Sequence, residues 1–125
     1  MRGLVSSGLL AAAIVVFAAG CTKDGSGKAF DEQMKQGCES YRASLDAAQR
    51  GDVQAYWDAR ASAIGAGVGA SEEASTKAQL VLVGGYSDGL GALGRDPETG
   101  KLLREKRLPD QPTSPEVETI CDHYE

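Results

Sequence analysis

The chain has 125 residues, of which 13 are Lys or Arg and 18 are Asp or Glu, and its formal net charge is −5. This acidic balance disfavours a nucleic-acid partner, because binding phosphates requires a basic surface. It also gives no electrostatic attraction to anionic lipid, so charge alone identifies no partner.

The first twenty residues have the layout of a secretory signal peptide. Arg2 and the amino terminus form a positive n-region, and a mostly apolar stretch follows from Leu4 to Ala19. This stretch has about sixteen residues, fewer than the roughly 20 that a transmembrane helix needs. We therefore expect cleavage after residue 20, with an uncleaved membrane anchor as the alternative. Loss of Arg2 would leave 12 basic and 18 acidic residues, a net charge of −6.

Three small residues, Ala18, Ala19 and Gly20, precede Cys21. The four residues together resemble the lipobox of bacterial lipoproteins, although Ala18 stands where that family usually has leucine. The resemblance implies that the Cys21 thiol receives diacylglycerol, that the chain is cleaved before Cys21, and that the new amino group is acylated, for example with palmitate. Two or more acyl chains give stable anchoring, whereas one binds only marginally. The implied location is the extracytoplasmic face of a cell membrane.

Lipidation of Cys21 would leave two of the three cysteines, Cys38 and Cys121. An exported chain matures in an oxidising compartment, where a remaining pair usually forms a disulfide. Each of the two lies on the apolar face of an expected helix. We therefore predict a Cys38–Cys121 disulfide that closes most of the mature chain. The mature part is also loosely similar to small helical lipoproteins with one cysteine in the first helix and one near the C-terminus, a likeness that implies no activity.

The composition divides the chain into a signal peptide at 1–20, a lipidated cysteine with a flexible tether at 21–29, and a helical domain at 30–125. The tether, "TKDGSGKA", is polar and rich in glycine and serine. Its eight residues reach at most about 26–29 Å when fully extended, which keeps the domain close to the membrane.

Apolar residues in the domain recur with helical spacing. A first helix is expected to begin with Asp31 as its cap and to end at Gly51, and a second begins with Asp52 as its cap. Their apolar stripes are Phe30, Met34, Cys38, Tyr41, Leu45 and Ala48 in the first, and Val53, Trp57, Arg60, Ile64 and Gly67, flanked by Tyr56, Ala61 and Val68, in the second.

The second half of the chain predicts two more helices and a loop. "GAGVGAS" should break the second helix, and Ser71 should start a third, which runs to Leu93 with Glu72 and Glu73 in its first turn. Residues 95–113 contain three prolines and should form a loop. Ser114 and Pro115 are typical first residues of a helix, and the final stripe is Val117, Ile120, Cys121 and Tyr124. The predicted fold is all-α, a small three- to four-helix bundle.

A possible catalytic motif lies in the third helix. Gly85 to Gly89 fits G-x-S-x-G, the nucleophile elbow of serine hydrolases, and Ser87, Asp110 and His123 follow the triad order of that family. The chain is much shorter than the hydrolase fold requires, and no strand pattern precedes the motif. A helical pattern fits better: Ala78, Val81, Leu82, Gly85, Tyr86, Gly89, Leu90 and Leu93 share one face, and Gln79, Ser87 and Asp88 point to water. Gly85 and Gly89 would then allow another helix to approach closely, with the same spacing at Gly65 and Gly69.

The C-terminal "CDHYE" offers possible metal ligands, but Cys121 and His123 would lie about 200° apart on a helix and could not share an ion. The sequence therefore predicts no catalytic residue, no metal and no cofactor. The expected function is a non-enzymatic interaction module held at the cell envelope, which binds an envelope or extracellular protein through glycine-spaced helix faces and aromatics such as Tyr86. A small serine hydrolase using Ser87, and a small-ligand binder, are the alternatives.

Overall fold

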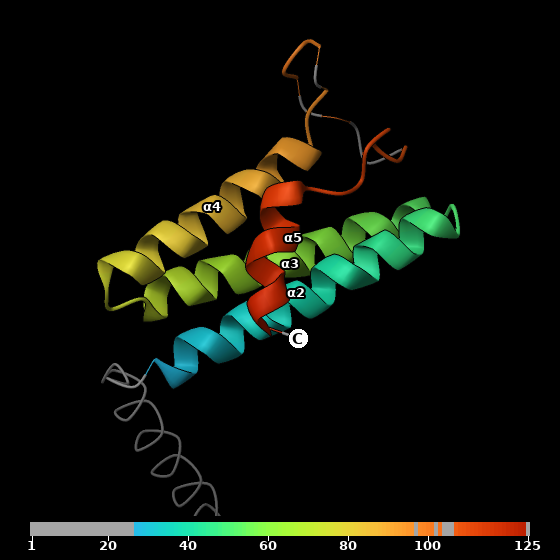
Figure 1. Ribbon diagram of the computed structural model, residues 1–125. Coiled ribbons are helices and arrows are strands. Elements are labelled where there is room, and N and C mark those ends of the chain that lie inside the picture. The colour runs from blue at the N-terminus through green and yellow to red at the C-terminus, as the bar shows by residue number, and fades with distance from the viewer. Residues whose placement is uncertain (1–26, 97, 102, 104–106, 125) are drawn as a thin grey trace, which may run out of the picture.

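The structure is a computed structural model that describes residues 27–96, 98–101, 103 and 107–124. This part of the chain forms the helices α2 (Lys28–Gln49), α3 (Val53–Glu73), α4 (Lys77–Leu93) and α5 (Pro115–Cys121), followed by the 3-10 turn η1 (Asp122–Tyr124) (Figure 1). It contains no strand, and the prediction of a small all-α bundle is confirmed.

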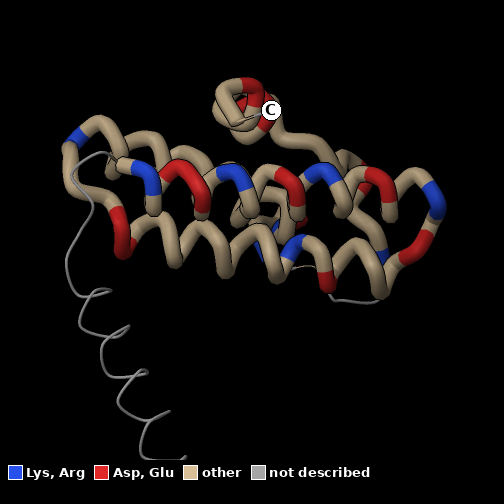
Figure 2. Tube along the Cα trace, turned by 90° about the horizontal axis from the view of Figure 1, so that it is seen from below, with Lys and Arg blue, Asp and Glu red and all other residues tan. Residues whose placement is uncertain are grey.

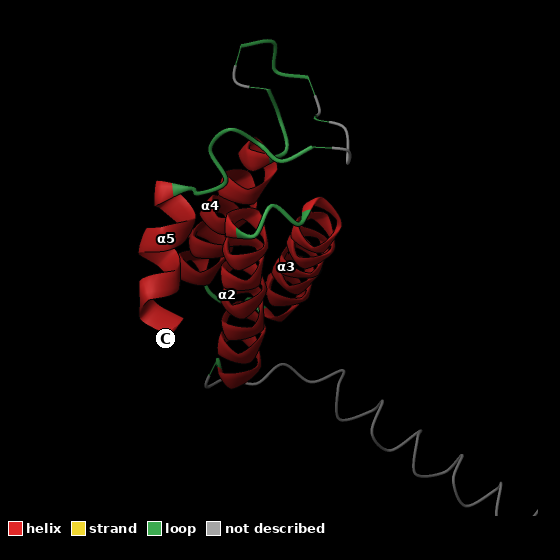
Figure 3. Ribbon diagram, turned by 90° about the vertical axis from the view of Figure 1, so that its right-hand side faces the viewer, coloured by secondary structure: helices red, strands yellow, loops and turns green. Residues whose placement is uncertain are grey.

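The helices α2, α3 and α4 run side by side, and consecutive helices are antiparallel because short turns join them (Figure 1). The shorter α5 crosses the bundle and packs on α2 and α4. Figure 3 shows α5 on the opposite side of α2 from α3. The N-terminal end of α2 and the turn between α3 and α4 lie at one end of the bundle, which we call the tether end. The α2–α3 turn and the long loop after α4 lie at the other, the far end.

Two of the three predicted caps that precede helices are confirmed. The Asp52 carboxylate accepts a 3.1 Å hydrogen bond from the backbone N–H of Ala55, and the Ser114 hydroxyl accepts one of 3.2 Å from Val117. The prediction for Asp31 is wrong, because α2 begins at Lys28, inside the expected tether, with Gly27 as its cap. Gly27 has φ 79°, a conformation open to glycine but strained for other residues.

The predicted break within the second helix is also wrong. Helix α3 continues through "GAGVGAS", and Glu72 and Glu73 lie at its end instead of starting the next helix. Thr76 starts α4 through a capping box, in which its hydroxyl accepts from the N–H of Gln79 and the Gln79 side chain accepts in return. Gly67 and Gly69 lie against Tyr86 of α4 and Gln33 of α2, contacts that offset a helix-propensity cost of about 1 kcal/mol for each glycine.

The apolar stripe of α3 differs from the prediction. Ile64 and Val68 are 37% and 57% exposed, whereas Ala63 and Ala70 are buried. The interface therefore selects small side chains over large apolar ones. The buried face of α4 also differs from the predicted one: Val83 is buried, whereas Val81, which was expected on the buried face, is 67% exposed.

The main core lies where all four helices meet. Its largest fully buried side chains are Phe30, Met34, Tyr41, Tyr86, Leu90 and Val117. A second, smaller cluster at the far end joins Ala47, Tyr56 and Trp57 to the loop residues Leu103 and Leu108. The Trp57 indole N–H donates a 2.9 Å hydrogen bond to the carbonyl of Arg107, which fixes the loop to α3.

Candidate functional site

Ser87 does not lie on a nucleophile elbow. An elbow requires a sharp turn between a strand and a helix, but Gly85 to Gly89 lie inside α4. No residue other than glycine has positive φ in the described part of the chain. Ser87 and Asp88 are exposed, as the helical pattern predicted.

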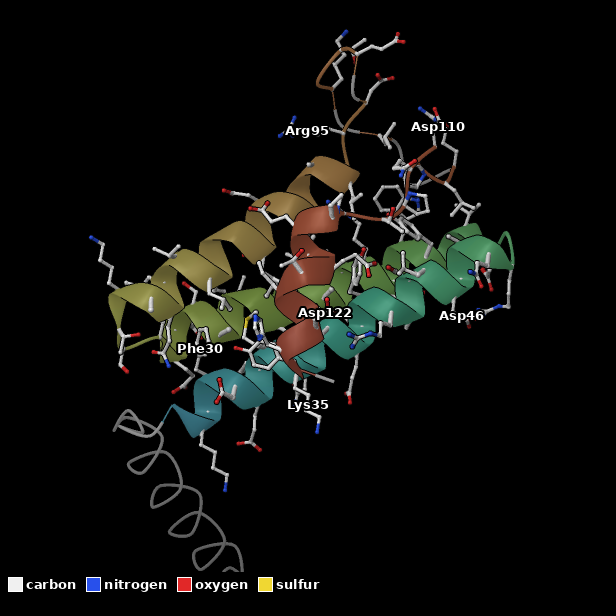
Figure 4. The ribbon with its side chains drawn as sticks, in the orientation of Figure 1. Phe30, Lys35, Asp46, Arg95, Asp110 and Asp122 are labelled. Carbon is white, nitrogen blue, oxygen red and sulfur yellow. A yellow bond between two sulfur atoms is a disulfide. The ribbon has the colours of Figure 1, made fainter. Side chains whose placement is uncertain are left out.

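The residues of the hypothetical triad lie apart. A Cβ atom built on Gly67 would be 3.3 Å from the Ser87 hydroxyl, so Ser87 faces α3. His123 belongs to η1, which packs on α2 and α5. Asp110 is in the far-end loop, 3.8 Å from the Arg107 guanidinium. Figure 4 shows Asp110 in the loop that precedes α5 and Asp122, the neighbour of His123, at the opposite, C-terminal end of that helix. A helix of seven residues is about 10 Å long, so Asp110 cannot orient the His123 ring.

Cys38 and Cys121 are joined across the core. Their Sγ atoms are 2.02 Å apart and their Cα atoms 5.5 Å apart, as a disulfide requires. Both residues are buried, and the bond ties α2 to the end of α5. A bonded Cys121 is no metal ligand, and the described residues include no group of three His, Cys, Asp or Glu placed to hold an ion.

Two glycines on α4 allow α5 to lie directly against it. A Cβ atom at Gly89 would come within 2.7 Å of Val117 and 2.8 Å of the Ser114 hydroxyl, and one at Gly85 within 3.2 Å of the Glu116 carboxylate. The expectation that this pair admits another helix is confirmed. The pair with the same spacing on α3 behaves differently: Gly65 faces open space, and Gly69 packs under the Gln33 side chain.

Tyr86 is not a surface contact residue, contrary to expectation, because it is fully buried. Its ring passes between two glycines, Gly37 on α2 and Gly67 on α3, where added Cβ atoms would collide with it. The phenol donates a 2.8 Å hydrogen bond to the carbonyl of Ala63. Burial raises the pKa of Tyr86 well above its ordinary value. The glycines thus shape an internal slot, which a helical-face pattern alone could not reveal.

A surface cavity, the far-end pocket, has a volume of about 390 Å³ and lies between the end of α4, the loop and the start of α5. Leu93, Leu103 and Pro109 form its apolar part, and its charged lining residues are Arg95, Asp96, Glu98, Arg107 and Asp110. The sequence analysis missed this pocket, since its residues come together only when the loop folds back. The backbone N–H of Leu103 makes that closure with the carbonyl of Gly94, at 2.7 Å.

Another surface cavity is an open apolar groove between α4 and α5. Ala78, Val81, Leu82 and Ile120 form its walls, with Lys77 and Glu116 among its charged residues. Leu80, the residue before Val81, is 52% exposed but does not line the groove. The sequence predicted that Val81 is buried. In the structure Val83 is buried instead, on the side of α4 from which the Tyr86 ring inserts between Gly37 and Gly67.

The lipobox, Cys21 and the signal peptide lie outside the described residues. Among the described helices, none combines the length and the apolar character that crossing a bilayer demands. Basic and acidic residues are interspersed along the helices (Figure 2).

No protein-family model, curated protein or solved structure matches the chain.

Proposed function

We propose that this protein is a lipoprotein, anchored by Cys21 to the extracytoplasmic face of a cell membrane, whose helical domain is a non-enzymatic interaction module. One observation carries the anchor: Cys21 follows a signal-like stretch and three small residues, and it is the one cysteine outside the Cys38–Cys121 bond. Two cysteines stabilise the fold, which leaves the third for the lipid.

The arrangement of the bundle supports a module that presents its far end. Five residues separate Cys21 from Gly27, so an anchored Cys21 would keep the tether end near the lipid. Helix α2 has 22 residues and is therefore about 33 Å long, which carries the far-end pocket away from the membrane. Figure 4 shows Phe30 at the tether end and Arg95 and Asp110 at the far end.

The far-end pocket is the contact region we propose for an envelope or extracellular protein. It combines apolar floor residues with charges of both signs on its rim, the usual pattern of a polar rim around an apolar contact. A cofactor or a nucleic acid is not part of this proposal. The acidic net charge of the chain disfavours a nucleic acid, whose phosphates require a basic surface.

Metabolic labelling with an alkyne fatty acid tests the anchor. The full-length protein should incorporate the label, and Cys21→Ala should abolish it. A variant with both Cys38→Ala and Cys121→Ala is the control and should keep the label, even where its fold is weakened. Label that persists in Cys21→Ala would refute the proposed anchor.

Crosslinking in membranes followed by affinity isolation tests the interaction. Asp110→Lys reverses a charge whose side chain is 92% exposed on the rim of the pocket, so it should reduce the captured partner without disturbing the fold. Asp58→Lys is the control, because Asp58 is exposed on α3 and accepts a hydrogen bond from the neighbouring Gln54. Equal capture by the two variants would exclude the pocket as the contact.

The same pocket favours a second candidate function, the binding of a small ligand. A volume of about 390 Å³ falls within the range of small-molecule sites. A thermal-shift screen with envelope extracts would distinguish the two candidates, since a small ligand survives removal of proteins from the extract and a protein partner does not.

A further inference from the structure

We propose that Leu80 and Val81, at the tether end of α4, rest on the lipid bilayer and orient the anchored domain. This inference rests on the proposed lipid at Cys21. It adds a direct contact between the folded domain and neutral lipid, made by apolar side chains instead of by charge.

The exposure of these two side chains is the first observation. Val81 is 67% exposed and Leu80 is 52% exposed, and both lie in the first turns of a helix whose other face packs in the core. Val81 also forms part of the apolar groove with Leu82 and Ile120, which extends the exposed apolar surface toward α5. Contiguous exposed apolar surface, such as Val81 forms with the groove, is typical of contact sites.

Their position relative to the tether is the second observation. A Cβ atom built on Gly27 would lie 2.9 Å from the Gln79 side chain, so the described chain begins beside the first turn of α4. Five residues separate Gly27 from Cys21, a reach of at most about 22 Å. Leu80 and Val81 are neighbours of Gln79, so a lipidated Cys21 would hold them close to the bilayer.

The change of polarity along α4 is the third observation and favours lipid over a protein partner. Lys77, Leu80 and Val81 lie on the outward side in the first turns, and the exposed acid Asp88 follows only two turns later. A lysine at the edge of an apolar surface can keep its ammonium in the headgroup region while its stem lies on apolar groups. The apolar part is thus confined to the end that the tether brings to the membrane.

The acidic charge of the chain sets the kind of lipid contact. The cleaved chain, with 12 basic and 18 acidic residues and a net charge of −6, gives no attraction to anionic headgroups, so the contact must come from apolar side chains that enter the interface. The inference therefore predicts a contact that forms on neutral phosphatidylcholine and that persists at high salt.

A test that does not depend on cellular lipidation uses residues 21–125 with the Cys21 thiol coupled to a maleimide phospholipid in phosphatidylcholine nanodiscs. The other two cysteines are bonded to each other, so Cys21 is the reactive thiol. Nitroxide-labelled acyl chains in the disc broaden the NMR signals of nearby methyl groups. The Leu80 and Val81 methyl signals should lose intensity about two-fold or more relative to those of Val53 and Leu108 at the far end.

Two variants of α4 make the test specific. Val81→Asp places a charge in the proposed contact and should bring the Leu80 methyl signal back toward the far-end values. Gly91→Asp adds the same charge to the same helix nearer the far end, where a side chain would meet open space, and should leave Leu80 broadened.

The outcomes separate this inference from the proposed function. Leu80 and Val81 signals as sharp as those of Val53 and Leu108 on the disc would overturn the lipid contact, even if Cys21 is lipidated in cells. Broadening of the same signals in solution, without nitroxide and with rising protein concentration, would assign the surface to a second copy and overturn it as well. Missing lipid on Cys21 in cells, with broadening on the disc, would instead refute the proposed anchor, while the affinity of Leu80 and Val81 for lipid, shown on the disc, would stand.

Discussion

The phenol oxygen of Tyr41 on α2 accepts a 2.9 Å hydrogen bond from the backbone N–H of Ser114, the residue that caps α5. The same phenol donates a 2.7 Å hydrogen bond to the Glu118 carboxylate, one turn further along α5. Tyr41 is 1% exposed. A single buried hydroxyl therefore fixes the start of α5 from two directions, while the Cys38–Cys121 bond fixes its end.

Removing this hydroxyl should destabilise the domain. Tyr41→Phe leaves the buried N–H of Ser114 without its partner, and we expect the free energy of unfolding to fall by about 1–3 kcal/mol. Urea denaturation followed by circular dichroism measures the change. Tyr56→Phe is the matched control, because the Tyr56 hydroxyl is buried without a hydrogen-bond partner among the described residues. Equal losses in the two variants would show that the Tyr41 hydrogen bonds contribute nothing specific.

The slot for Tyr86 gives a second prediction. In Gly37→Ala the new methyl group would collide with the Tyr86 hydroxyl and lie 3.2 Å from the Cβ of Ala66, so we expect a loss of about 1–3 kcal/mol in unfolding free energy. In Gly84→Ala the methyl group meets open space inside α4, and helix propensity should stabilise the domain by up to about 1 kcal/mol. Thermal unfolding of both variants should shift in opposite directions. Shifts in the same direction would contradict the tight slot.

These glycines show how far the sequence predicts the fold. The helical period, Asp52, Ser114 and Pro115 are local signals, and they located α2, α5 and the start of α3 to within a few residues, but not the end of α3. The break expected at "GAGVGAS" failed because helix propensity is local, whereas Gly67 is held helical by the Tyr86 ring from another helix. Spacing alone cannot distinguish a glycine that ends a helix from one that admits a neighbour.

The candidate site was less predictable than the fold. The far-end pocket depends on a loop that folds back through the Leu103–Gly94 and Trp57–Arg107 hydrogen bonds, and neither contact has a sequence pattern. The exposed surface at Val81 was missed for a related reason. In the glycine-rich α4, two neighbouring choices of buried helix face contain similar numbers of apolar residues. Which face is buried is decided by the packing of Tyr86 between other helices, which the sequence pattern does not contain.

The disulfide should contribute a large share of the stability. It closes a loop of 82 intervening residues, for which the chain-entropy model gives about 4–5 kcal/mol. The double variant Cys38→Ala with Cys121→Ala should therefore unfold at much lower urea concentration than the native chain. Thiol titration of unfolded, unreduced Cys21→Ala protein should detect no thiol. Two titratable thiols would disprove the bond.

The buried tyrosines predict a loss of stability at alkaline pH. Burial raises the pKa of Tyr41, Tyr56 and Tyr86 above the ordinary value of 10.0, and the Glu118 carboxylate adds to the rise at Tyr41, although the Ser114 N–H partly offsets it. Above pH 10 the unfolded chain loses these protons while the folded chain keeps them. Unfolding free energy should therefore be insensitive to these groups below pH 10 and fall above it, by about 1.4 kcal/mol per pH unit for each tyrosine.

Phenolate absorbance and circular dichroism, recorded together during an alkaline titration, check this dependence. The buried tyrosines should ionise in step with unfolding, since the folded core excludes the phenolate. Tyr86→Phe removes one of the linked groups and should make the decline with pH less steep. Ionisation of all four tyrosines near pH 10 with the helical signal intact would contradict the burial of these side chains.

The environment of Ser87 predicts that it has no nucleophilic role. Its hydroxyl lies on a regular helix beside α3, and the Asp110 and His123 of the hypothetical triad are separated by the length of α5. A serine without a general base is a weak nucleophile. The folded protein should therefore not react with a fluorophosphonate probe, and Ser87→Ala should leave both stability and partner capture unchanged. Labelling of the native protein that is lost in Ser87→Ala but kept in the control Ser62→Ala on α3 would show that the protein is a serine hydrolase and would refute the non-enzymatic function.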